Sequence, residues 1–261
     1  MITLSSAQLD AWIMLLIWPF ARILALIAAA PISGSQQFPT TAKIGLAVLL
    51  ATLVAPTLPA APPVDPASLA GLMLLARETL LGVGMGLAMR VVFSGVSMAG
   101  DVIGLQMGLG FAQFYDAQTS AQVPVIGQFL GLLATLVFLS LNGHLLVIAT
   151  LVDSFRSVPV DSAKTLADSF MAFALWGGMI IQAAVLLSMP LIAALLVTNS
   201  ALGVLSRAAP QLNVFAIGFP VTIIAGFVVL LLTLPYWVPA FERLFELGLQ
   251  AMLRTAGGIA R

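Results

Sequence analysis

The chain has no cysteine, one histidine and few charged residues. Without cysteine it can form no disulfide, no thiolate metal site and no cysteine nucleophile. The single histidine, His144, excludes a histidine metal cluster within one chain, and we expect neither a metal nor a cofactor. Ten basic side chains balance ten acidic ones, so no basic excess points to nucleic acid as a partner.

Charge is scarce in this chain and apolar side chains are abundant. Of the 261 residues, 8% are charged and 61% are hydrophobic, and the mean hydropathy is +1.13. Soluble domains contain about 25% charged residues, so these charges are too few to cover a surface that faces water. We therefore expect residence in a membrane or burial inside a large assembly.

Apolar runs fall at about 11–32, 42–58, 69–100, 123–151, 170–198 and 212–235. Each is close to or above the roughly 20 residues that span a bilayer. They are continuous rather than alternating, which argues against the strands of a membrane barrel. The sequence predicts an all-α fold of helical hairpins of the integral-membrane type. The proline-rich segment 56–66 predicts an extended connector.

Glycines recur at four-residue spacing inside these runs. The segment 82–86 superficially looks like a dinucleotide-binding loop, but it follows no strand and lies inside a long apolar run. Close packing of helices through small residues is the favoured interpretation. The glycines to which we assign this role are Gly82, Gly86, Gly100 and Gly104.

Arg22, Arg77, Glu78 and Arg90 interrupt apolar runs. A charge at the centre of a bilayer costs roughly 2.5–3.5 kcal/mol on insertion scales, so each needs a partner or water. Arg77 and Glu78 are adjacent and point about 100° apart on a helix, so they do not simply pair with each other. Each needs a partner elsewhere in this chain or in another. A structural ion pair is favoured over a proton relay.

The segment Gly108–Asp116 combines glycines with bulky aromatic side chains between two long apolar runs. Such a loop can close a pore by steric blockage and dewetting. An aromatic anchor at a membrane interface is an equally open interpretation. The C-terminal segment, from Phe241 to Arg261, is amphipathic and suits a lipid surface or a partner, with a solvated tail as the alternative.

No nucleophile–base pair, helical carboxylate pair or phosphate-cradling loop is evident, so we expect no enzyme. A different class of function is a polytopic secondary transporter or channel for a small solute. Pro190 and Pro220 motivate it, because broken helices form the sites of such proteins.

The stretch from Arg207 to Pro220 places an arginine, the amides Gln211 and Asn213, and prolines at the mouth of an apolar run. It resembles the hallmark of the flagellar type III export-gate family called FliR, which has relatives in virulence injectisomes. Further pieces of the chain resemble this family and occur in the family's order. They are Arg77-Glu78, the segment 107–112 followed by Asp116, Asn142-Gly143-His144, and Ser154-Phe155 with Pro159.

The resemblance implies a single export-gate domain over residues 1–261, with a P-like portion at 1–170. A Q-like helical hairpin and a C-terminal amphipathic helix would occupy 171–261. Implied partners are five P-type and four Q-type gate subunits, the large export-gate and B-type components, unfolded flagellar substrates and membrane lipids. The implied location is the flagellar basal body in the bacterial inner membrane, largely above the bilayer plane on the periplasmic side.

The resemblance also assigns roles to residues. The gate or plug loop would comprise Gln106, Met107, Gly108, Gly110, Phe111, Phe114, Tyr115 and Asp116. Residues for pairing between subunits, or for structural polar contacts, would be Arg77, Glu78, Arg207, Gln211 and Asn213. The implied function is to conduct unfolded flagellar proteins across the inner membrane during flagellum assembly.

Overall fold

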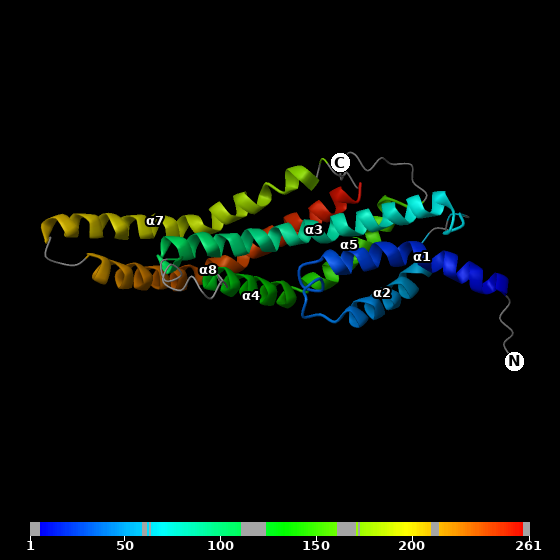
Figure 1. The fold of residues 1–261 in the computed structure, drawn as a ribbon, viewed down its shortest axis with the longest axis horizontal. Coiled ribbons are helices and arrows are strands. Elements are labelled where there is room, and N and C mark those ends of the chain that lie inside the picture. Colours follow the sequence, from blue (N-terminus) through cyan, green and yellow to red (C-terminus); the bar gives the residue numbers. More distant parts are fainter. Residues whose placement is uncertain are drawn as a thin grey trace, which may run out of the picture. The chain divides into compact units, whose positions relative to one another are not determined.

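The structure, a computed structural model, describes residues 6–58, 62, 64–110, 124–160, 171, 173–209 and 214–257. These residues contain helices and no strand, which confirms the all-α prediction. The α-helices are α1 (Ser6–Ala29), α2 (Thr40–Val54), α3 (Leu69–Gln106), α4 (Val125–Ser140), α5 (Gly143–Ser157), α7 (Met179–Ala208) and α8 (Val214–Thr255) (Figure 1).

Proline and polar caps explain where the second and third helices end and begin. Helix α2 passes into a short 3-10 turn at Ala55–Thr57, after which the proline-rich connector starts. At the start of α3, the Ser68 hydroxyl accepts a hydrogen bond from the Gly71 backbone N–H at 3.0 Å. The Asp65 carboxylate accepts another from the Ala67 N–H at 2.9 Å. Such side chains satisfy backbone donors that an unpaired helix start would leave open.

Helix lengths bear on how the chain could meet a membrane. By length and composition, four helices in the described part could cross one: Thr40–Thr57, Leu69–Gln106, Phe173–Ala208 and Ile217–Thr255. Counting α4 and α5 together gives a fifth. The break between them lies at Asn142, whose left-handed φ of 55° is tolerated by asparagine. The five later apolar runs therefore correspond to four or five possible spans, and the first run, at about 11–32, is not among them.

The chain forms two compact units. Unit 1 contains residues 1–91, 142–177 and 245–261, and unit 2 contains residues 92–141 and 178–244. Helices α3 and α8 are each divided between the two units, with one part in unit 1 and the other in unit 2. The division into a P-like portion at 1–170 and a Q-like portion at 171–261 is a different one and stays a prediction.

In unit 1, α1 packs against α2 (Figure 1) and also against the first part of α3. The last turns of α8 belong to this unit. Phe245, Ala251 and Met252 are buried there, while Glu246 and Arg254 are exposed. The amphipathic C-terminal segment is thus the end of α8. From residue 245 onward, its apolar side chains are buried within unit 1.

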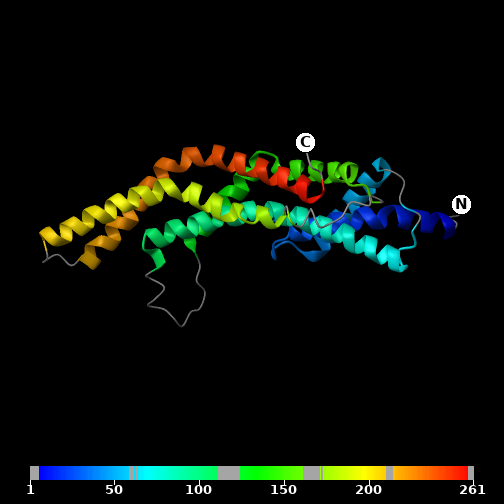
Figure 2. The same ribbon diagram turned by 90° about the horizontal axis from the view of Figure 1, so that it is seen from above.

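Unit 2 contains the end of α3 together with α4, α7 and most of α8. Phe93 of α3 and Phe138 of α4 form an edge-to-face pair with ring centroids 5.6 Å apart. A Cβ on Gly95 of α3 would lie 2.9 Å from the Ala183 Cβ of α7. In both views α7 and the first part of α8 lie next to each other and run in opposite directions (Figures 1 and 2).

Candidate functional site

A buried arginine joins three segments of unit 1. Arg22 of α1 and Glu78 of α3 are both fully buried, and the guanidinium donates to both carboxylate oxygens, Nε to Oε2 at 2.7 Å and Nη2 to Oε1 at 3.0 Å. Nη1 donates to the Ser154 hydroxyl at 3.2 Å and Nη2 to the Val158 carbonyl at 3.0 Å. The guanidinium carbon lies 4.1 Å from the centre of the Phe155 ring.

This arrangement stabilises both charges without water. A buried ion pair is tolerated when its geometry is good and its remaining donors are also satisfied. Here a two-pronged contact with the carboxylate, a hydroxyl, a carbonyl and an aromatic face surround the guanidinium. The cluster therefore fixes α1, α3 and the end of α5 to one another, and it gives Glu78 its partner inside the same chain.

The other polar residues singled out by sequence have varied surroundings. Arg77 is half-buried and its Nη1 donates to the Val160 carbonyl at 3.1 Å. Arg207 is exposed in the last turn of α7. Gln211 and Asn213 lie outside the described residues. An inter-subunit role for these side chains stays a proposal.

The start of the predicted loop is buried in unit 2. Met107 follows the last residue of α3 and is fully buried, and Gly108 has a left-handed φ of 81°. The hydroxyl of Thr222 of α8 donates to the Phe219 carbonyl at 3.0 Å and also lies 3.4 Å from the Met107 carbonyl. A Cβ on Gly226 would lie 2.5 Å from the Cγ and 2.8 Å from the sulfur of Met107.

The remaining predicted loop residues divide into two groups. Gln106 is exposed, and Gly110 is half-buried near the Leu105 side chain. The others, Phe111, Phe114, Tyr115 and Asp116, lie outside the described residues. Their assignment to a gate stays a proposal.

Three of the four glycines assigned to helix packing lie at close backbone approaches. A Cβ on Gly82 would meet the Arg22 carbonyl of α1, and one on Gly86 would lie 2.9 Å from the Ala30 backbone nitrogen. A Cβ on Gly100 of α3 would lie 2.5 Å from the Gly127 Cα of α4. Gly104 has looser surroundings, because a Cβ there would come no closer than 3.7 Å to the Ile126 side chain.

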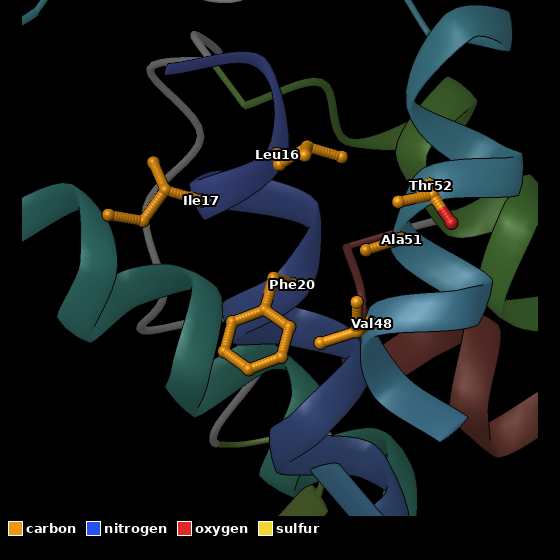
Figure 3. A pocket seen from close by; sticks show the side chains of 6 residues that line it. All are labelled: Leu16, Ile17, Phe20, Val48, Ala51 and Thr52. Atoms are coloured by element: carbon orange, nitrogen blue, oxygen red, sulfur yellow. The ribbon is translucent and has the colours of Figure 1, made fainter. Parts of the chain in front are cut away.

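An apolar pocket of about 260 Å³ lies between α1 and α2 in unit 1 (Figure 3). Its lining is Leu16, Ile17, Phe20, Val48, Ala51 and Thr52. The Thr52 hydroxyl already donates to the Leu49 carbonyl at 2.8 Å. No charged side chain lines the pocket, so it offers little to orient a polar ligand.

Metal chemistry finds no support in the described residues. Within that part of the chain, no group of three or more histidine, cysteine, aspartate or glutamate side chains could hold a metal ion.

Sequence reasoning missed the partners of several residues that it selected. It identified Arg22 and Glu78 separately, but a spacing of 56 residues carries no signal that the two meet. It also missed Thr222 and Gly226, although a glycine within an apolar helix is a cue for close backbone approach. The Ser154-Phe155 pair was recognised only as part of a motif.

Comparison with known proteins shows that several flagellar proteins are similar to this chain over most of its length. The protein of Pectobacterium carotovorum named flagellar biosynthetic protein FliR is 43% identical over 94% of both chains. The proteins of the same name from Escherichia coli K12 and Bacillus subtilis are 40% and 34% identical over 94% and 89% of this chain, and 94% and 91% of their own lengths. Residues 13–248 match the family described as bacterial export proteins, family 1. The chain therefore belongs to this family of bacterial export proteins.

Proposed function

We propose that this chain is a subunit of the flagellar type III protein export gate in the bacterial inner membrane. In this role it helps to conduct unfolded flagellar proteins across that membrane during flagellum assembly. The observation that carries the proposal is the match to a bacterial export family over residues 13–248, with relatives named for flagellar biosynthesis. The chain acts as a conduit and not as an enzyme.

The surface of the chain supports a place inside an assembly. Helices α7 and α8 expose large apolar side chains, for example Val197 and Leu232. Polar side chains are also exposed on apolar helices, among them Arg90 of α3 and Asn199 of α7. A lipid environment disfavours such groups, whereas a protein neighbour can offer them partners.

The proposed partners are five P-type and four Q-type gate subunits, the large export-gate and B-type components, and the unfolded substrates. In this arrangement the apolar faces are covered mainly by sister subunits, with lipid contacts around them. The gate then lies in the flagellar basal body, largely above the bilayer plane on its periplasmic side. Arg77, Glu78 and Arg207 contribute structural or inter-subunit polar contacts.

The proposed gate is the loop that follows α3. Residues 106–116 close the lumen of the assembled gate, and Phe111 and Phe114 supply the blocking side chains. The burial of Met107 supports this proposal, because a fixed start would hold a short loop at a defined position. Closure by aromatic bulk needs no chemistry and only excludes water and ions from the pore.

Deletion of residues 110–115 tests the gate role. We expect the complex to assemble with its partners and to conduct ions when no substrate is present. Conductance of the purified assembly in planar bilayers measures the leak, and co-purification through a tag on this chain measures assembly. An assembled complex with unchanged conductance would reject the plug role.

The alternative, a secondary transporter for a small solute, is favoured by no observation in the described residues. Its motivation was helix breaks at Pro190 and Pro220. Pro190 lies inside α7 and Pro220 inside α8, so neither proline ends its helix. Solute uptake by vesicles that contain this chain alone would support the transporter and contradict the export gate.

A further inference from the structure

The residue that follows α3, Met107, packs closely against Gly226 of α8. Met107 is fully buried, and its Cγ, Sδ and Cε occupy the space next to Gly226 that any larger residue would fill. The distances from a Cβ at position 226 to these atoms would be 2.5–2.8 Å, closer than real contacts allow. Glycine weakens a helix relative to alanine, so this close approach is a physical reason for a glycine within α8.

Two further contacts hold the backbone just beyond α3. The Thr222 hydroxyl, one helical turn from Gly226, shares its proton between the Phe219 carbonyl at 3.0 Å and the Met107 carbonyl at 3.4 Å. Gly108 has a φ of 81°, which ends the helix in the left-handed region that suits glycine. A Cβ at position 108 would lie 3.1 Å from the Phe219 ring of α8. The direction in which the chain leaves α3 is thus set by one face of α8.

We propose that Phe219, Thr222 and Gly226 of α8 are positioning residues that seat Met107 and thereby aim the loop that follows α3. We call Phe219, Thr222 and Gly226 the seat, and in this proposal its contacts with Met107 stay formed in every state of the assembled complex. This inference rests on the proposed gate function. It adds that closure depends on α8 residues that lie outside the loop.

Substitution at the seat tests the proposal. We expect Gly226→Val to displace Met107 and to raise the ion conductance of the substrate-free assembled complex in planar bilayers. Gly203→Val is the matched control, because a Cβ at Gly203 of α7 has no neighbour within 4 Å. A Gly226→Val complex that assembles and conducts no more than the Gly203→Val complex would overturn the proposal.

A compensating change keeps the test decisive if Gly226→Val disturbs folding. Met107→Ala removes the atoms that the new side chain would strike. We expect the double variant Met107→Ala/Gly226→Val to regain assembly and low conductance relative to Gly226→Val alone. If the double variant is as defective as Gly226→Val, then the contact with Met107 is not the cause and the seat has no positioning role.

A disulfide tests whether the seat is fixed. A Cβ at position 226 would lie 2.5 Å from the Met107 Cγ. The two Cβ atoms of a Met107→Cys/Gly226→Cys pair are therefore at most about 4 Å apart, which a disulfide can bridge. The chain has no other cysteine, so within this chain copper phenanthroline and oxygen would oxidise these two thiols alone. We expect the oxidised complex to remain closed and to export substrate as well as the reduced one. Export that stops on oxidation and resumes on reduction would contradict a fixed seat.

Deletion of the loop, measured in the same conductance assay, distinguishes failure of the gate function from failure of the positioning role. If the deletion of 110–115 causes a leak while Gly226→Val does not, the gate function stands and the seat fails. If the deletion causes no leak, the gate function itself fails.

Discussion

At the scale of single residues, the Arg22–Glu78 pair is a fully buried ion pair with a two-pronged contact between guanidinium and carboxylate. Both side chains are fully buried, and their separation along the chain makes the contact a long-range one. Removal of one partner from a buried pair leaves an uncompensated charge and typically costs about 3–5 kcal/mol. The pair therefore holds α1 and α3 of unit 1 together.

We predict that Glu78→Ala destabilises the chain by about 3–5 kcal/mol, because it strands the buried Arg22 guanidinium. The apparent melting temperature and the yield of the assembled complex in detergent measure the effect. The double variant Arg22→Met/Glu78→Leu should recover much of the loss, since no unpaired charge remains. A Glu78→Ala protein as stable as the parent would contradict this account of the pair.

The surface pair Asp153–Arg156 provides the matched control. Its atoms are 3.8 Å apart, and its side chains are 60% and 71% exposed. Exposed pairs contribute about 0–1 kcal/mol, so Asp153→Ala should change the melting temperature little. A loss as large as that of Glu78→Ala would show that burial does not distinguish the two pairs.

The sequence predicted that Glu78 needs a partner, because a carboxylate in an apolar run cannot stay unpaired. It could not predict which partner, since Arg22 and Arg90 have the same chemistry and a partner in another chain was equally open. Only the packing of α1 on α3 and α5 brings Arg22 to Glu78, together with Ser154 and Val158. Residue type therefore indicated the need for a contact, and tertiary structure determined the contact.

At the scale of the helices, small residues decide how closely backbones approach. A Cβ on Gly86 would lie 2.6 Å from the Ala29 Cβ and 2.9 Å from the Leu26 carbonyl oxygen of α1. Gly84 lies on the same helix, yet a Cβ there would meet nothing closer than the Thr255 Cβ at 3.9 Å. The two glycines therefore have different roles although they belong to one glycine-rich segment.

We predict that Gly86→Ala destabilises the chain by about 1–3 kcal/mol, because the added methyl group forces α1 away from α3. By contrast, Gly84→Ala should be neutral or stabilising by up to about 1 kcal/mol, owing to the better helix propensity of alanine. Thermal unfolding in detergent, with both variants compared to the parent, measures the difference. Equal effects would contradict the proposed packing.

Helix type and position could be predicted well from long apolar runs, and the proline-rich segment 56–66 marked the end of α2, but other helix ends could not be predicted. The run at about 123–151 contains two helices, because Asn142 adopts a left-handed conformation that hydropathy does not reveal. Conversely, broken helices at Pro190 and Pro220 were one interpretation of the sequence, yet neither proline ends its helix. The C-terminal segment was expected to face lipid, a partner or water. Its apolar side is instead buried by unit 1, which a pattern of spacing alone cannot show.

At the scale of the whole molecule, the exposed surface decides between lipid and protein as the main neighbour. Arg90 is exposed on α3, a helix long and apolar enough to cross a membrane. In lipid this arginine would cost roughly 2.5–3.5 kcal/mol on insertion scales. Against another subunit it could pair with an acidic or carbonyl group.

We predict that Arg90→Leu lowers the amount of partner subunits that co-purify with the tagged chain, because it removes a polar contact at the interface. If Arg90 faced lipid, leucine would be the better residue and assembly would be unchanged or improved. The ratio of partner to tagged chain, measured by quantitative mass spectrometry, distinguishes the two outcomes. Arg156→Leu, at an exposed site near the end of α5, serves as the control.

The central claim is that this apolar chain covers its surface mainly with sister proteins. Native mass spectrometry of the complex purified through a tag on this chain tests it most directly. The account predicts one copy of this chain with several copies of smaller apolar subunits, in one assembly of defined mass. A stable, solitary chain surrounded only by lipid in a native-like nanodisc would contradict it.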